Sequence, residues 1–322
     1  MAEQAKEPSP KKKMNKNYRL IGLVIIVALV LFILIVMWVN SIKPKEIILE
    51  DVDAKIRGGY FIKINQALIR QMYENWLPND IFWPTALLDN MPNFQLGELE
   101  VVRYNVRIIR DNLSRMRTTD KLDPQAEAAF TFLSNDPNKY WFPSAESKWK
   151  KGYENLDAFY QNLIQGKSYF YPRADNLIEL LSQYASLMGG ANTRLILAPG
   201  DIHRTLAMEE LEMKSKDNEM IEVDIPWHKV DNNFYYAQGI AYALYHSFKA
   251  IKVDFERVLI DKNSMKLVDQ ILENLKRCDF EPLIVFNGDP DSMFANHSLN
   301  LSGVFNDARQ KINSLISALD QG

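Results

Sequence analysis

Apolar residues recur at alternating steps of three and four along most of the chain after residue 60, which is the spacing of one face of an α-helix. The clearest run starts at Phe234 and reaches Val258 with eight consecutive matches. Similar runs predict helices over residues 61–72, 99–116, 149–163, 177–188, 268–278 and 305–319. No long region alternates with the period of two that is typical of a strand, so we predict an all-α body, a multi-helix bundle.

Proline residues and polar clusters divide these runs. The stretch from Trp76 to Phe94 cannot be one helix, because Pro78, Pro84 and Pro92 would break it, and we expect a Pro/Trp-rich loop over residues 76–94. The polar run Lys214–Glu222 is the best candidate for a linker. We therefore divide the body into a first helical lobe, a linker and a second helical lobe, over residues 40–213, 214–226 and 227–322.

One block near the N-terminus is apolar throughout. Leu20–Val39 contains no charged residue and only one glycine. At about 1.5 Å of rise per residue it spans about 30 Å, the thickness of the hydrocarbon core of a bilayer. A cleavable signal peptide has a shorter apolar core and a small-x-small cleavage site, which residues 37–41 do not supply. We predict an uncleaved transmembrane signal-anchor helix over residues 20–39, with the lipid bilayer as its partner.

Charge is distributed unequally on the two sides of this block. The chain has a formal net charge of −3, of which residues 1–19 hold +4, so the part from Asn40 onward holds −7. Basic flanks stay in the cytoplasm, so we predict a disordered cytoplasmic tail over residues 1–19 and a body outside the cytoplasm. The acidic body gives no case for a nucleic-acid partner.

The sequence contains no complete catalytic or cofactor motif. The single cysteine, Cys278, excludes an intramolecular disulfide and multi-cysteine metal sites, and it continues an apolar stripe, so we expect a buried thiol. Gly166-Lys167-Ser168 resembles the end of a phosphate-binding loop but lacks the first glycine, and Gly166 is better explained as a helix C-cap. His246 lies off the main seam of its helix, where we expect it to pack against a second helix. We predict no catalytic residue, no metal and no cofactor.

Four arginines at helical spacing form a candidate basic stripe: Arg103, Arg107, Arg110 and Arg117. Lipid headgroups or an acidic partner would suit such a stripe. The alternative is pairing within the chain to acidic neighbours such as Glu100 and Asp111.

Two stretches concentrate Asn, Asp and aromatic residues in loops, where functional residues tend to lie. They supply the candidate binding or structural-pin residues Asp89, Asn90, Asn287, Asn296 and His297. We expect Ser302 or Asn300 to cap the last helix, which leaves Asn296 and His297 without a capping role. These residues then either hold the connection between two packed helices or face a ligand, and we favour the first.

Four strings in these regions carry a resemblance: Leu88-Asp-Asn-Met-Pro-Asn-Phe, Phe234-Tyr-Tyr-Ala-Gln-Gly, Ala295-Asn-His-Ser-Leu, and the stretch from Val253 to Asn263. In order and content they resemble a family of uncharacterised proteobacterial inner-membrane proteins known by a domain-of-unknown-function label. Gln238 departs from a Glu in the family pattern. The resemblance implies a Gram-negative source, an inner-membrane anchor and a periplasmic body, and it implies no reaction.

Three classes of function fit these observations. The first is a non-catalytic, membrane-anchored module that binds an unidentified envelope protein or its own copies, and we favour it because it explains the anchor and the missing motifs. The second is a periplasmic domain that binds a ligand or lipid. The third is a cell-envelope enzyme of unfamiliar type, which would need polar groups converging in a cleft.

Overall fold

The computed structural model describes residues 16–49, 52, 56–196, 230–282, 285 and 296–321. Within these ranges the protein consists of helices and connecting segments and contains no strand. The predicted all-α fold is therefore confirmed. The predicted linker over residues 214–226, and Asn287, lie outside the described residues.

The helices have the following bounds: α1 Lys16–Asn40, α2 Gly59–Glu74, the 3-10 turn η1 Thr85–Leu87, α3 Asn90–Ile108, the π-helical turn η2 Ile109–Leu113, α4 Pro124–Leu133, α5 Ala145–Ile164, α6 Ala174–Ile196, α8 Val230–Asp254, α9 Glu256–Asp261, α10 Met265–Arg277 and α11 His297–Asp320. Most of the predicted apolar runs coincide with one of these helices. The stripe from Trp149 to Leu163, for example, lies on α5, which begins where the Ser144 hydroxyl accepts the N–H of Ser147.

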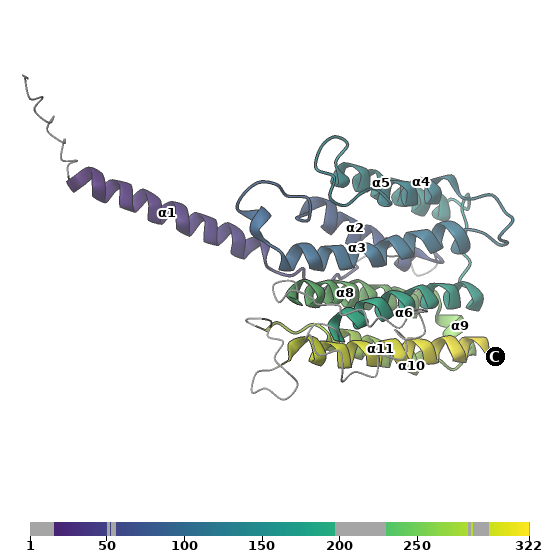
Figure 1. Cartoon of the computed structure of the whole chain (residues 1–322). Coiled ribbons are helices and arrows are strands. Elements are labelled where there is room, and N and C mark those ends of the chain that lie inside the picture. Colours follow the sequence, from purple (N-terminus) through teal and green to yellow (C-terminus); the bar gives the residue numbers. More distant parts are fainter. Residues whose placement is uncertain are drawn as a thin grey trace, which may run out of the picture.

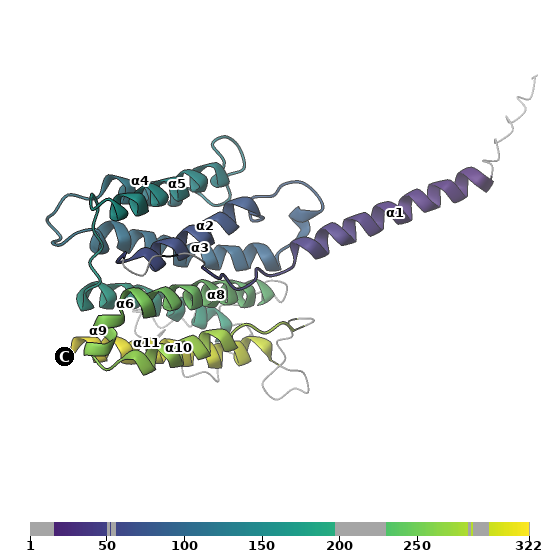
Figure 2. The same cartoon turned by 180° about the vertical axis from the view of Figure 1, so that it is seen from behind.

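The body stacks pairs of helices on one another, as Figures 1 and 2 show. In order, the pairs are α4 with α5, α2 with α3, α6 with α8, and α10 with α11. One large apolar core runs through all of them, and a smaller cluster of Leu77, Met91 and Phe94 is separate from it. Helices from both predicted lobes contribute to this core, because α8 packs against α2, α3 and α6, and α11 packs against α6.

Two glycines allow α3 and α8 to approach very closely. A Cβ atom on Gly97 would lie 2.1 Å from the Tyr236 carbonyl oxygen, and one on Gly239 would lie 1.8 Å from the Phe94 carbonyl oxygen. Neither position has room for a side chain unless the helices separate. The contact between α3 and α8 therefore depends on glycine at both positions.

The structure corrects three helix boundaries. The predicted helix over 234–258 ends at Asp254, because Phe255 leaves helical geometry, and Val258 belongs to the short α9. Residues 90–94 are helical even though they include Pro92, because that proline lies in the first turn of α3, where its missing N–H has no intrahelical partner to lose. Met116 lies beyond η2 and is exposed.

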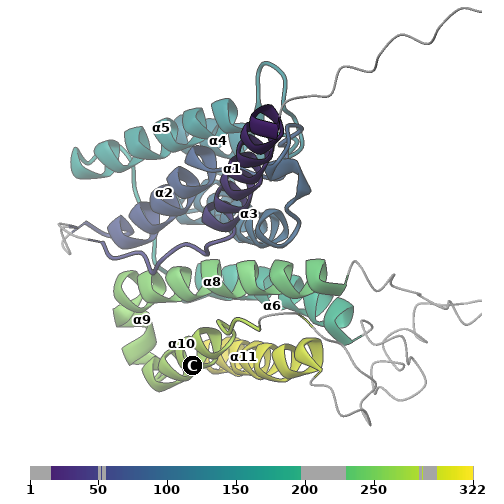
Figure 3. The same cartoon turned by 90° about the vertical axis from the view of Figure 1, so that its left-hand side faces the viewer.

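The apolar helix α1 projects away from the body at one end (Figure 1), and the chain ends at the opposite end. Its segment Leu20–Asn40 has a mean hydropathy of 3.6, and none of it is buried in the protein. Its length and composition suit a membrane anchor or a signal sequence. The end that carries α1, viewed along the helix in Figure 3, includes η1 and the connection between α4 and α5.

Candidate functional site

The segment that joins α1 to the body lies along α8, and we call its described part, residues 41–49, the strap. At its start Lys43 has only 11% of its side chain exposed. Its ammonium lies 3.2 Å from the Asp279 carboxylate and 3.5 Å from that of Glu281. These ion pairs connect the strap to the chain just after α10.

The middle of the strap is held by side chains of α8. The Tyr242 hydroxyl donates to the Lys45 carbonyl at 2.8 Å and lies 3.2 Å from the side-chain amide of Gln71 on α2. The Glu46 carboxylate accepts from the Tyr245 hydroxyl at 3.1 Å and from the Lys249 ammonium at 2.6 Å. Residues from three consecutive turns of α8 thus hold two adjacent residues of the strap.

His246 lies beneath the strap and is fully buried. Its ring meets the rings of Tyr242 and Tyr245 edge to face, at 4.6 and 5.3 Å between centroids. Its Nε2 accepts the backbone N–H of Ile47 at 3.5 Å, and its Nδ1 has no hydrogen-bond partner within the described structure. The expected burial of His246 is confirmed, and the hydrogen bond at the tip of its ring is made with the strap.

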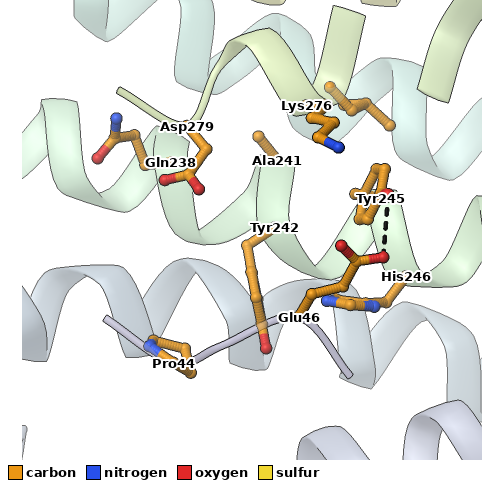
Figure 4. A pocket seen from close by; sticks show the side chains of 10 residues that line it. Pro44, Glu46, Gln238, Ala241, Tyr242, Tyr245, His246, Lys276 and Asp279 are labelled. Atoms are coloured by element: carbon orange, nitrogen blue, oxygen red, sulfur yellow. Dashed lines mark hydrogen bonds between the residues drawn. The ribbon is translucent and has the colours of Figure 1, made fainter. Parts of the chain in front are cut away.

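A small pocket of about 90 Å³ remains beside the strap (Figure 4). Pro44 and Glu46 border it from the strap, while Tyr242, Tyr245 and His246 border it from α8. A wider, open depression of about 490 Å³ continues between α8 and α10 and is lined by Lys249, Lys252 and Lys276, among others.

Electrostatics near the strap favour fixed charge states at neutral pH. Burial, and then the neighbouring Lys249, lower the pKa of His246 to about 4, so the imidazole is neutral. The hydrogen bond from Lys249 holds the pKa of Glu46 below its ordinary value, so this carboxylate is charged. Neither group titrates near pH 7, and both are engaged in holding the strap.

Beneath this region, α3 carries two buried polar side chains with opposite surroundings. Asn105 is fully buried; its amide donates to Asn65 at 2.8 Å and to Ser247 at 2.9 Å, and its oxygen accepts from the Tyr184 hydroxyl. Glu98 is 1% exposed, and neither of its carboxylate oxygens has a hydrogen-bond partner in the described part of the chain. Burial raises the pKa of Glu98 to about 8.

The residues predicted from the two Asn-rich loops lie at helix starts. Asp89 precedes α3, and its carbonyl oxygen accepts from the backbone and side chain of Asn93, at 3.1 and 2.8 Å. Asn90 is the first residue of α3. Neither residue borders the pocket beside the strap.

Asn296 is the N-cap of α11, since its side-chain oxygen accepts the N–H of Leu299 at 2.9 Å. The prediction that Ser302 or Asn300 caps this helix was wrong, because the helix begins one turn earlier, at His297. Ser302 instead donates to Asn192 of α6 at 2.8 Å, and so joins two packed helices.

Three arginines of the predicted basic stripe pair within the chain. Arg103 donates to the Leu133 carbonyl at 3.0 Å and pairs with Glu100 at 3.0 Å. Arg110 makes a two-point contact with Asp111 at 2.6 and 2.8 Å, and Arg107 lies 3.8 Å from the same carboxylate. Intramolecular pairing is therefore confirmed for these three. Arg117 is exposed and lies beyond the end of η2, so it does not continue the helical stripe.

Two further predictions are confirmed. Cys278 is fully buried, and burial raises the pKa of its thiol to about 12, which keeps it protonated and unreactive. Gly166 follows the end of α5 with a positive φ of 68°, the conformation of a residue just after a helix C-cap.

The strap and Glu98 were both missed in the sequence. The strap has no periodicity that would assign it to an element, and its partners on α8 lie about 200 residues further along the chain. One signal was present: Tyr242, His246 and Lys249 share a polar face of α8, which indicated that something covers that face.

The described protein is an all-helical bundle that carries an apolar N-terminal helix on a bound strap. The chain belongs to DUF2333, a family described as an uncharacterized protein conserved in bacteria, whose family model matches residues 12–322. The resemblance to a domain-of-unknown-function family is thereby confirmed, and the match includes the apolar helix as well as the body. No curated protein and no solved structure matches the chain.

Proposed function

We propose that the protein is a single-pass membrane protein whose helical body binds other envelope proteins or further copies of itself, without catalysis. The observation that carries this proposal is the strap. Ion pairs at Lys43 and hydrogen bonds at Lys45, Glu46 and Ile47 fix the body directly beside the end of α1. A scaffold needs a body held at a defined distance from its membrane, and a strap bound along α8 supports such a role.

The polar groups near the pocket support the same proposal. An active site brings together polar groups that are free to act on a substrate. Here the Tyr242 hydroxyl, the Glu46 carboxylate and the His246 Nε2 already hold backbone or side-chain partners. The enclosed pocket of about 90 Å³ is small beside the roughly 300–1,000 Å³ of typical small-molecule sites, and the depression of about 490 Å³ next to it is open to solvent.

For the location we propose the inner membrane of a Gram-negative bacterium, with residues 1–19 in the cytoplasm and the body in the periplasm. The excess of basic residues before Leu20 supports this orientation. Alkaline phosphatase fused after Gly322 should be active in bacterial cells, because this enzyme needs export. An inactive fusion at normal expression would contradict the orientation.

The binding role is tested by cross-linking in living cells, followed by purification of the tagged full-length chain from membranes. We expect defined cross-linked species that contain either an envelope protein or a second copy of the chain. A chain that is recovered only as an uncross-linked monomer, at native expression and with several cross-linkers, would contradict the proposal.

A further inference from the structure

We infer that the body makes a second contact with the bilayer, through an aromatic surface at the end from which α1 projects. The surface consists of Ile81, Phe82, Trp83, Leu87, Trp141 and Phe142, and we call it the aromatic tip. The inference rests on the proposed membrane anchoring by α1, and it adds that the body lies against the surface of the same membrane.

The aromatic tip is built by two loops that support each other. The Trp76 indole N–H donates to the Pro137 carbonyl at 2.9 Å, and the Asn79 amide donates to the Lys139 carbonyl at 3.3 Å. The Phe82 and Tyr140 rings meet edge to face at 5.8 Å. The loop before α3 and the loop between α4 and α5 therefore form one surface, although they are far apart in sequence.

The side chains at this surface are large, apolar and unusually exposed. Phe142 is 94% exposed, Trp141 72% and Phe82 64%. The stretches 81–88 and 140–144, which carry them, contain no charged residue. Exposed apolar surface of this kind indicates an interaction site, and Trp beside Phe is typical of the zone where a bilayer meets water.

The position of the aromatic tip favours a bilayer as its partner. Its 3-10 turn, η1, lies against the end of α1 at which the apolar segment stops (Figure 1). Trp38, 69% exposed, lies in the last turns of that segment, where an interfacial aromatic residue is expected. If α1 crosses a membrane, the aromatic tip lies at the depth of the lipid headgroups on the side of the body. The apolar surface of α1 thus continues into the aromatic tip.

The experiment uses the full-length chain in nanodiscs of phosphatidylethanolamine and phosphatidylglycerol. A fluorophore that responds to polarity is attached to Phe142→Cys or, as a second site on the other loop, to Phe82→Cys. Cys278 stays unlabelled because it is fully buried. The matched control is Ile260→Cys on α9, which is also exposed (60%) but lies at the opposite end of the body.

We expect the labels at residues 82 and 142 to shift to blue emission. They should lose fluorescence to lipids that carry a nitroxide near the headgroup and resist quenching by aqueous iodide, while the label at 260 shows the opposite pattern. A label on Leu29→Cys, in the middle of the apolar segment, reports on anchoring itself when the lipids carry the nitroxide deep in the acyl chain. One outcome is that the label at 29 is quenched by lipid while those at 82 and 142 behave like the one at 260. In that case the aromatic tip does not contact the membrane, and its partner is a protein. If the label at 29 also escapes lipid quenching, the anchoring proposal fails.

Discussion

Two buried polar side chains on α3, seven residues apart, show opposite solutions to the same physical problem. Asn105 is surrounded by partners on α2, α6 and α8, so its burial costs little. Glu98 is equally buried but has no hydrogen-bond partner for either carboxylate oxygen in the described structure. The first arrangement fixes how four helices fit together. The second keeps a carboxyl group protonated, because the ionised form would be unsolvated.

The largest effect is expected from removing the hydrogen-bonded side chain of Asn105. Asn105→Ala leaves the Asn65 amide oxygen buried without its donor, removes the acceptor of the Tyr184 hydroxyl and opens a small cavity. We expect the free energy of unfolding to fall by about 4 kcal/mol, measured by urea denaturation of the full-length chain in detergent. The matched control is Asn300→Ala, at an exposed position of α11, with a change within about 0.5 kcal/mol. Equal effects of the two substitutions would mean that the network around Asn105 does not hold the helices together.

The second test replaces Glu98 and compares the stability of the two proteins at different pH values. In the unfolded chain Glu98 ionises near its ordinary pKa of 4.5, whereas in the folded protein its pKa is about 8. Between these values the unfolded chain releases a proton that the folded chain keeps, so the stability of the wild-type protein falls as the pH rises.

Glu98→Gln removes this ionisation. We expect the stability of the variant relative to the wild type to rise by about 3 kcal/mol between pH 5 and pH 8, because over this range the unfolded wild-type chain loses the Glu98 proton while the folded chain keeps it. The measurement is the difference between the two unfolding curves at each pH, so other titrating groups such as Asp254 cancel. Parallel pH profiles would show that Glu98 is ionised in the folded protein and has a partner.

The smallest effect is expected from removing the Tyr184 hydroxyl, which donates to Asn105. Tyr184→Phe keeps the ring among its apolar neighbours and removes only the donor to Asn105. We expect a loss of about 1 kcal/mol in unfolding free energy. In a double-mutant cycle with Asn105→Ala the two losses should not add, because both remove the same hydrogen bond. Additive losses would show that the two side chains act independently.

The sequence predicted the helices whose burial is confined to a single apolar stripe. On α11 all members of the stripe from Phe305 are buried, and on α5 the stripe from Trp149 includes the buried Trp149, Leu156 and Tyr160. The π-helical turn and the break at Phe255 could not be predicted in this way, because neither requires a proline or glycine and the apolar spacing continues across both. Pro92 was misinterpreted because its effect depends on its distance from the helix start, and that start was unknown.

The polar interior was harder to predict, for a different reason. Gln95, Glu98 and Asn105 repeat at helical spacing on α3, but a search for apolar periodicity passes over them. They are buried because α3 is covered by α2 on one side and α8 on another, which only the tertiary structure reveals. The strap depends on contacts between residues about 200 positions apart, so no local pattern indicates it.

If α1 anchors the protein in a membrane as proposed, the direction of the strap has a mechanical consequence. Its contacts follow the course of α8: Lys43 lies near Asp279, and next come Lys45 and Glu46 opposite Tyr242 and Tyr245. Beyond the strap, at the other end of α8, Asp254 accepts the N–H groups of Gly58 and Phe61 at the start of α2. A pull on α1 along this line stretches these contacts together, in shear, instead of peeling them away one after another. Tension arising in the membrane would thus be shared along the length of α8 and reach the far end of the bundle without first detaching the near end.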